Sequence, residues 1–361
     1  MRAVQLVAPS APLELRELPR PKPGDGEVVV RVAGCGVCHT DVGFWKDGVS
    51  TRRPPPITLG HEIAGTVEET SPDYADLLGR DVIVPSVIPC GRCDLCRSGR
   101  GNVCRAQRMP GNDMDGGFAE YVRVPGLGLC PVEERGGLEL AELSVVADAV
   151  TTPYQAVMRS GLRDGDLAVI VGVGGVGAHC VQIASALGAR TVAVDVDPDR
   201  LEAVEPHGAD LTVDVSASTF KELRSRIRDA ASDWGCSQHG WKIFECSGAA
   251  AGQENAFGLV NHAGVLMLVG FTLEKVTVRL SNLMALDATA QGTWGCLPEL
   301  YPGALELVTS GRIALRPFVE IHPLSDGPEV VRRVADHEIR NRAILVPDPV
   351  EGGSGRPVED H

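Results

Sequence analysis

Residues 166–215 contain the pattern that most restricts the fold of this chain. An apolar run, "LAVIV", leads into "GVGGVG", and a helix-like segment and a second apolar run, "TVAVD", follow. A strand, a glycine turn, a helix and a further strand in this order predict a doubly wound parallel sheet. The later apolar runs in "GWKIFECSG" and "AGVLMLVGF" are expected to be buried strands of the same sheet.

The glycine turn also carries a functional prediction. Gly172, Gly174 and Gly177 fit the spacing G-x-G-x-x-G, which lets backbone N–H groups approach a pyrophosphate at a helix N-terminus. The loop, with Gly175 and Val176, is therefore predicted to bind a dinucleotide. A glycine-rich turn without a ligand is the alternative.

A carboxylate favours one dinucleotide over another. Asp195 ends the second strand, 18 residues after Gly177. In that position it can bind both ribose hydroxyls and repel a 2′-phosphate, so NAD is favoured over NADP.

The first 130 residues have a different character, with short β-like runs, Pro and Gly. Residues 25–35, "DGEVVVRVAGC", alternate polar and apolar side chains as a strand does. This favours an irregular antiparallel domain, and 361 residues suffice for two cores. We therefore expect an α/β chain with one domain at 1–150 and 294–350, a nucleotide-binding domain at 151–293, and a flexible tail at 351–361.

Four of the eleven cysteines lie in "CGRCDLCRSGRGNVC", spaced C-x2-C-x2-C-x7-C. Cys90, Cys93, Cys96 and Cys104 can form a closed tetrahedral thiolate site, which predicts a structural zinc. An iron–sulfur cluster is the alternative, but the neighbourhood offers no electron partner.

A second metal site is predicted from "GCGVCHTD" and "LGHEIAG". Cys38, His61 and Glu62 are all possible ligands, and a catalytic zinc needs three protein ligands and one open position. Each residue alone is a weak signal, because a single Cys or His is more often buried and inert.

The stretch "VVADAVTTPY" places one carboxylate, Asp148, in an apolar run. Burying an unpaired charge is costly, so from these residues alone Asp148 is expected to cap a helix or to lie in a solvated loop. Thr152 and Pro153 predict a helix start with Thr152 as cap, and Gly161 predicts its end.

Together these motifs resemble the zinc-dependent medium-chain dehydrogenases of the alcohol dehydrogenase type along nearly the full chain. The matching residues are "GCGVCHTD", "GHEIAG", the four cysteines, "GVGGVG", Asp195 and the late "NRAILVP". The resemblance implies a β-rich GroES-like catalytic domain beside a Rossmann domain, two zinc ions per chain, and NAD as oxidant of an alcohol. It also implies a homodimer or homotetramer in which edge strands of the nucleotide domains pair.

The resemblance assigns roles to single residues at the metal site. Cys38, His61 and Asp148 would hold the catalytic zinc, a Lewis acid that lowers the pKa of a bound alcohol. Glu62 would support the site from behind or become a transient fourth ligand. Thr40 would accept the proton of the alcohol, and Asp41 would orient His61.

Further roles concern the cofactor and the proton. His39 and Arg342 match positions that contact the pyrophosphate, and Thr152 matches one beside the nicotinamide. Many family members have His where this chain has Gly43. The proton relay must therefore end at Thr40 and the ribose, use water, or find another base.

A narrower resemblance concerns the substrate. "VVADAVTTPYQ", "RMPGN", "GWKIFE" and "GTWGCLPELYP" are similar to 6-hydroxycyclohex-1-ene-1-carbonyl-CoA dehydrogenases of anaerobic aromatic degradation, which implies a ring alcohol on a CoA thioester. The coenzyme A phosphates would need cationic partners; the candidates are Arg92, Arg97, Arg100, Arg105 and Arg108. The alternatives for this arginine cluster are a solvated face or a subunit contact.

Composition excludes some classes of function. A net charge of −14 and a pI near 5.1 argue against nucleic-acid or anionic-membrane partners. Without a signal peptide or a membrane-spanning apolar run, a cytoplasmic location is expected. Two rival functions are open: a dehydrogenase of a simple secondary alcohol or polyol without CoA, and a non-catalytic regulator that binds NAD and zinc.

Overall fold

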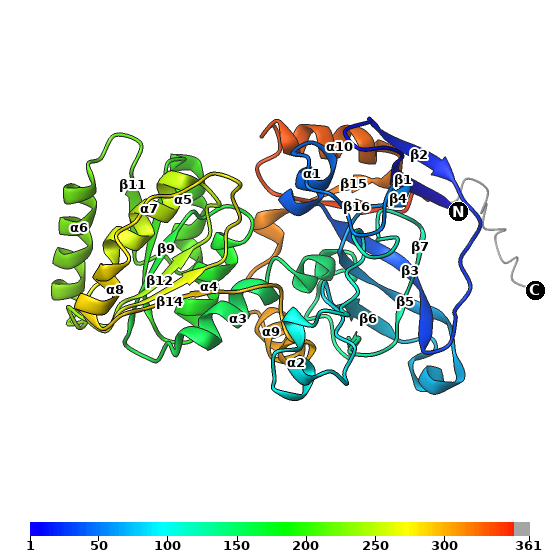
Figure 1. Cartoon of the computed structure of the whole chain (residues 1–361), viewed down its shortest axis with the longest axis horizontal. Coiled ribbons are helices and arrows are strands. Elements are labelled where there is room, and N and C mark those ends of the chain that lie inside the picture. The colour runs from blue at the N-terminus through cyan, green and yellow to red at the C-terminus, as the bar shows by residue number, and fades with distance from the viewer. Residues whose placement is uncertain (350–361) are drawn as a thin grey trace, which may run out of the picture.

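The computed structural model describes residues 1–349 as two lobes side by side (Figure 1). The tail expected at 351–361 lies outside the described residues. One lobe contains a parallel sheet and the other contains two mainly antiparallel sheets. Within 1–349, no helix is long and apolar enough to cross a membrane.

The first lobe is the predicted parallel sheet, with strand order β11-β10-β9-β12-β13-β14. Its strands are β9 (Leu167–Val171), β10 (Arg190–Asp195), β11 (Leu211–Asp214), β12 (Lys242–Glu245), β13 (Val265–Leu268) and β14 (Thr289–Gly292). The helices of this lobe are α4 (Gly177–Ala186), α5 (Pro198–Val204), α6 (Phe220–Asp233), α7 (Ala250–Leu259) and α8 (Ser281–Leu286). All five residues of β9 are buried, because helices cover both faces of a parallel sheet.

The second lobe is built on β3 (Glu27–Gly36), which pairs antiparallel with three neighbours. Its main sheet has the order β15-β16-β3-β5-β6-β8, with β7 paired to β3. The other strands are β5 (Glu62–Thr70), β6 (Asp81–Val84), β7 (Tyr121–Pro125), β8 (Cys130–Pro131), β15 (Val319–Pro323) and β16 (Arg342–Val346). A small sheet contains β1 (Arg2–Leu6), β2 (Leu13–Glu17) and β4 (Ile57–Thr58). The predicted antiparallel character is confirmed, except that β15 and β16 run parallel.

Five helices belong to the second lobe or lie between the lobes: α1 (His39–Trp45), α2 (Asp94–Arg97), α3 (Thr151–Ser160), α9 (Tyr301–Thr309) and α10 (Gly327–Ala335). Helix α3 ends at Gly161 as expected, with a left-handed φ of 68°. The predicted cap is wrong, because α3 begins at Thr151 after Val150 and Thr152 lies inside the helix. The hydroxyl of Thr152 donates a hydrogen bond to the side chain of Asp148 and does not cap the helix N–H groups.

Strands β15 and β16 return the end of the chain to the sheet that contains β3. We propose that the boundaries expected near residues 150 and 293 separate two domains, because the strands of the two large sheets come from either side of them. The link between the lobes then includes α3, which starts directly after the segment that contains Asp148.

Candidate active site

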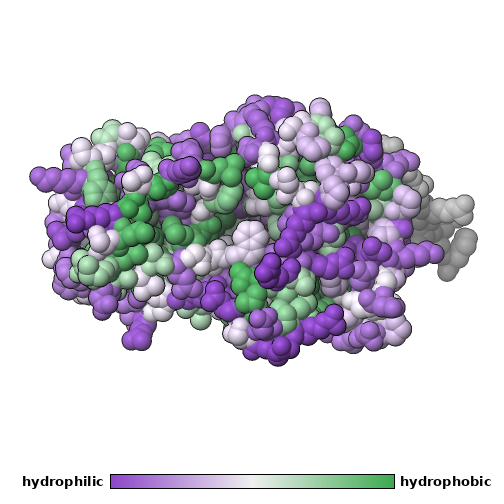
Figure 2. Space-filling view, viewed as in Figure 1, coloured by the Kyte–Doolittle hydropathy of each residue, from purple (hydrophilic) through white to green (hydrophobic). Residues whose placement is uncertain are grey.

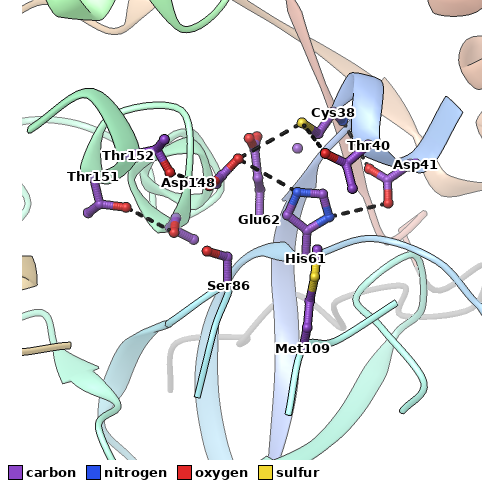
Figure 3. Close-up of polar contacts among 12 residues, drawn as sticks. Cys38, Thr40, Asp41, His61, Glu62, Ser86, Met109, Asp148, Thr151 and Thr152 are labelled. Carbon is purple, nitrogen blue, oxygen red and sulfur yellow. Dashed lines mark hydrogen bonds and ion pairs between the residues drawn. The ribbon is translucent and has the colours of Figure 1, made fainter. Parts of the chain in front are cut away.

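Three separate segments bring four metal-binding side chains together (Figure 3). Cys38 immediately precedes α1, His61 and Glu62 lie at the start of β5, and Asp148 precedes α3. One ligand atom of each lies within 4.8 Å of the others. The fold therefore unites the three ligands predicted for a catalytic zinc with Glu62.

The geometry of this cluster fits a metal ion. The Sγ atom of Cys38 lies 3.9 Å from Oδ2 of Asp148, and Nε2 of His61 lies 3.7 Å from the same oxygen. Ligands at about 2.0–2.3 Å from a tetrahedral zinc lie roughly 3.3–3.8 Å apart. One sulfur, one imidazole and a carboxylate form a suitable donor set, so the residues present fit a catalytic zinc.

Burial and neighbouring charges shift the acids of this cluster in opposite directions. Burial raises the pKa of Asp148, but its contacts with His61 and Thr152 outweigh this and bring it to about 2. Burial raises the pKa of Glu62 to about 7 despite Arg342, whose Nη1 lies 3.7 Å from Glu62 Oε1. Within residues 1–349 neither carboxylate oxygen of Glu62 has a hydrogen-bond donor, so both oxygens keep acceptor capacity for a cation.

Asp41 lies behind His61 as predicted. Its Oδ1 is 3.3 Å from Nδ1 of His61 and accepts a hydrogen bond from the backbone N–H of Gly60 at 3.0 Å. Its Oδ2 accepts from the backbone N–H of Cys38, also at 3.0 Å. A fully buried carboxylate thus connects two of the ligand segments and fixes the imidazole ring.

Two threonines border the cluster. Thr40 Oγ1 lies 3.7 Å from Cys38 Sγ, and Thr152 Oγ1 donates a hydrogen bond of 2.6 Å to Asp148 Oδ1. Figure 3 also places Ser86 and Met109 at the cluster. Neither residue was predicted at the site: Ser86 lies in no motif, and Met109 lies in "RMPGN", which entered only through the narrower resemblance.

The four-cysteine lobe, by which we mean residues 90–104 within the β-rich half of the molecule, matches its prediction closely. The Sγ atom of Cys93 lies 3.4 Å from Sγ of Cys96 and 3.6 Å from Sγ of Cys104. The Sγ atoms of Cys90 and Cys96 are 3.9 Å apart. Zn–S bonds of about 2.3 Å in a tetrahedron give separations of roughly 3.8 Å. The cluster therefore fits a second, closed zinc site.

The glycine loop has the backbone that a dinucleotide requires. Gly172 has a φ of +87°, and a Cβ there would lie 2.4 Å from the Cα of Ser247. A Cβ on Gly177, the first residue of α4, would lie 1.8 Å from the Gly172 carbonyl oxygen. Side chains are excluded at both positions, so the loop stays tight at the helix N-terminus.

Two guanidinium groups flank this loop. Arg342 approaches Gly175, and Arg200 approaches Gly174; their nearest nitrogens would be 3.1 and 3.6 Å from a Cβ on these glycines. Among the described residues neither Nε atom has a hydrogen-bond partner, although Arg200 Nε forms an ion pair with Asp197 Oδ2 at 3.6 Å. Arg342 was a predicted phosphate contact, whereas Arg200 was missed; its position in α5, directly after β10, was the available signal.

Asp195 lies at the end of β10 as expected. Its Oδ2 accepts from the backbone N–H of Val173 at 2.7 Å, and its Oδ1 accepts from that of Val196 at 2.8 Å. The carboxylate is thereby held against the glycine loop. Its Oδ1 also accepts from the backbone N–H of Asp197 at 3.0 Å, so Oδ2 is the oxygen with acceptor capacity left for a hydroxyl.

His39 stacks on His337, with ring centroids 5.7 Å apart. Burial, followed by the charge of Arg342, lowers the pKa of His39 to about 4. The electropositive surroundings suit the anion contact predicted for His39. His337 lies in the loop between α10 and β16, and no sequence motif predicted its contact with His39.

The arginine cluster is smaller than predicted. Arg108 is half-buried, and its Nη1 donates to Glu27 Oε1 at 2.7 Å. Glu27 lies more than 60 residues before the cluster, so the local sequence around the arginines did not indicate this ion pair. The four remaining members are exposed: Arg92, Arg97, Arg100 and Arg105.

Comparisons with known proteins agree with this geometry. Residues 24–134 match the model of the alcohol dehydrogenase GroES-like domain, and residues 175–310 match that of the zinc-binding dehydrogenases. An alcohol dehydrogenase of Geobacillus stearothermophilus is 31% identical over 358 residues, which cover 96% of this chain and 100% of the relative. An NAD-dependent alcohol dehydrogenase of Sulfurisphaera tokodaii is 36% identical over 247 residues, 64% of this chain and 70% of the relative.

Among solved structures, an alcohol dehydrogenase of Aeropyrum pernix superimposes with a TM-score of 0.83 at 29% identity, covering 96% of this chain and 100% of the other. A GroES-like lobe and a parallel Rossmann sheet define the class of two-domain dehydrogenases. Within that class, the chain belongs to the zinc-binding alcohol dehydrogenase family, and its two clusters fit two zinc ions.

Proposed function

We propose that this protein oxidises a secondary alcohol to a ketone and transfers the hydride to NAD. The observation that carries the proposal is the convergence of Cys38, His61, Glu62 and Asp148 within 4.8 Å, near the start of the helix that leads to the nucleotide lobe. A purely regulatory protein has no need for such a ligand set with a threonine hydroxyl beside it.

The residues of the metal site have distinct tasks in this proposal. Cys38, His61 and Asp148 hold a zinc ion that supplies Lewis acidity for an alcohol oxygen. Asp41 keeps the imidazole of His61 in its orientation. Thr40 accepts the proton of the alcohol through its hydroxyl, and with Gly43 in α1 the onward path uses water or another base.

The cofactor is held by the glycine loop from Gly172 to Gly177, including Gly174, Gly175 and Val176. Arg342 and His39 contact the pyrophosphate, and Asp195 binds the ribose hydroxyls. Arg200 adds a second guanidinium beside the loop. Thr152, which is hydrogen-bonded to Asp148, lies beside the nicotinamide and so couples the metal site to the hydride acceptor.

For the substrate, we propose 6-hydroxycyclohex-1-ene-1-carbonyl-CoA or a similar ring alcohol on a CoA thioester. The support is the narrower sequence resemblance and the exposed arginines of the four-cysteine lobe. A simple secondary alcohol or polyol is the second candidate, and the similarity of this chain to alcohol dehydrogenases favours it.

Two further expectations belong to this proposal. Pairing through the edge strand β14 would give a homodimer or a homotetramer. The exposed Phe271, Leu280 and Met284, which lie in the chain segment between β13 and β14, support such a contact. A cytoplasmic location remains the expectation from the sequence.

The test is NADH formation by the zinc-loaded protein with the CoA thioester, beside cyclohexanol and 2-cyclohexen-1-ol. Turnover of the thioester alone supports the specific substrate. Turnover of the free alcohols alone retains the reaction and rejects the CoA assignment. No turnover of any alcohol would favour the regulator.

A further inference from the structure

The structure brings two arginines together at the place where the two lobes meet near the metal site. Arg100 belongs to the four-cysteine lobe, and Arg159 lies near the end of α3. Asn102, two residues after Arg100, accepts a hydrogen bond of 3.1 Å from Arg159 Nη2. Sequence patterns did not indicate that Arg159 lies near the arginine cluster, because 59 residues separate it from Arg100.

This junction is built into the protein. Asn102 is fully buried and donates at 2.8 Å to the carbonyl oxygen of Trp294. Gln155, one turn before Arg159 on α3, donates to the carbonyl oxygen of Gly295 and accepts from the backbone N–H of Leu297. Residues 293–297 are therefore held between α3 and the four-cysteine lobe, and Asn102 holds the guanidinium of Arg159 beside them.

The charge of this junction is unbalanced. Within residues 1–349, neither Arg100 nor Arg159 has a carboxylate oxygen within 4 Å, although many other arginines of the chain form ion pairs. Burial lowers the pKa of Arg159, and the guanidinium of Arg100 lowers it further. Two like charges with one of them half-buried, in a chain of net charge −14, leave a local demand for an anion.

The junction is also within reach of the metal site. Thr152 and Arg159 are seven residues apart on α3, which is ~10 Å along a helix axis. Burial raises the pKa of Cys296, and the charges of Asp148 and Arg159 are both near enough to shift it further, in opposite directions. A substrate with its hydroxyl at Asp148 could therefore extend a tail of about this length to Arg159.

We propose that Arg100 and Arg159 form a subsite for a phosphate group on the tail of the alcohol substrate. Planar guanidinium groups bind phosphate oxygens in pairs, and Asn102 holds Arg159 in place for this contact. Around α2 the surface is mostly hydrophilic, with apolar patches beside it (Figure 2), and a hydrophilic surface suits a charged tail. The subsite rests on the proposed alcohol oxidation and narrows it to phosphate-bearing substrates, of which a CoA thioester is one and a shorter phosphate ester is another.

The test measures anion binding by calorimetry on the zinc-loaded protein saturated with NADH, so that the dinucleotide site is already filled. The probes are free coenzyme A and inorganic pyrophosphate. Arg159→Gln and Arg100→Gln should each weaken binding about tenfold or more, and higher salt should weaken wild-type binding. Arg228→Gln removes an equal charge from the exposed face of α6 and should leave binding within about twofold of wild type.

Each outcome decides the proposal. Absence of binding for both probes would overturn the subsite even if cyclohexanol is oxidised. A loss in Arg159→Gln but not in Arg100→Gln would mean that Arg159 merely supports segment 293–297, which also overturns it. Tighter binding of coenzyme A than of pyrophosphate supports a CoA tail, whereas the reverse supports a shorter phosphate ester. Binding that depends on both arginines without turnover of any alcohol would retain the subsite and reject the reaction.

Discussion

Residues 90–104 supply all four sulfur atoms of the lobe cluster, whereas the catalytic cluster draws its ligands from residues 38, 61, 62 and 148. The four-cysteine cluster takes its ligands from one short loop, all of them are sulfur atoms, and they leave no open position for a substrate. The catalytic cluster is long-range and mixes a sulfur, an imidazole and carboxylates, and its ligands are held by partners such as Asp41 and Thr152. The four-cysteine site depends on the closure of one short loop. The catalytic site depends on the correct packing of three segments that lie far apart in the sequence.

Removing a ligand from the catalytic cluster should have the largest effect on activity. Asp148→Ala leaves two of the three predicted protein ligands, Cys38 and His61. Loss of several kcal/mol of transition-state stabilisation corresponds to a fall in kcat of about 10³-fold. Metal analysis should give one zinc per chain in place of two, with the lobe zinc retained. Two zinc ions in the variant would show that Asp148 is no ligand.

Removing a ligand from the lobe should reverse this pattern. Cys96→Ser should also reduce the zinc content to one per chain, but the main loss should be in stability, on the order of several kcal/mol for the lobe. The measurements are thermal unfolding and kcat with a CoA-free alcohol. A loss of kcat as large as that of Asp148→Ala would contradict the distinction between the two sites.

The same contrast explains how much the sequence could predict. The lobe was predictable because four cysteines within one short loop have few other arrangements, and the parallel sheet was predictable because its strands are continuous apolar runs around a glycine turn. Asp148 as a ligand required a family resemblance, since the packing that places it 3.7 Å from His61 spans 87 residues of sequence. Arg159 and Glu27 were beyond reach, because their partners lie in segments that only the folded chain brings together.

A weaker perturbation concerns the buried carboxylate behind His61. Asp41→Asn keeps the size of the side chain but loses the charge that faces Nδ1 at 3.3 Å. Zinc affinity at the catalytic site should fall roughly 10- to 100-fold, measured by competition with a chelator, and the lobe zinc should be unaffected. Asp47→Asn, an exposed acid just after α1, is the matched control; equal effects of the two changes would reject a specific role for Asp41.

The smallest effect is expected from a single hydroxyl on α3. Thr152→Val removes the hydrogen bond of 2.6 Å to Asp148 Oδ1 at nearly constant volume, and a bond to a charged group contributes about 1.5–3 kcal/mol. Because zinc would compensate part of the exposed charge, we expect kcat to fall about tenfold with both zinc ions retained. Thr151→Val is the control, since Thr151 donates to the backbone oxygen of Ala147 at 3.0 Å and not to Asp148. If Thr151→Val lowers kcat as much as Thr152→Val, the start of α3 rather than the contact with Asp148 controls the reaction. The catalytic cluster would then depend less on single supporting hydrogen bonds than its contrast with the four-cysteine site implies.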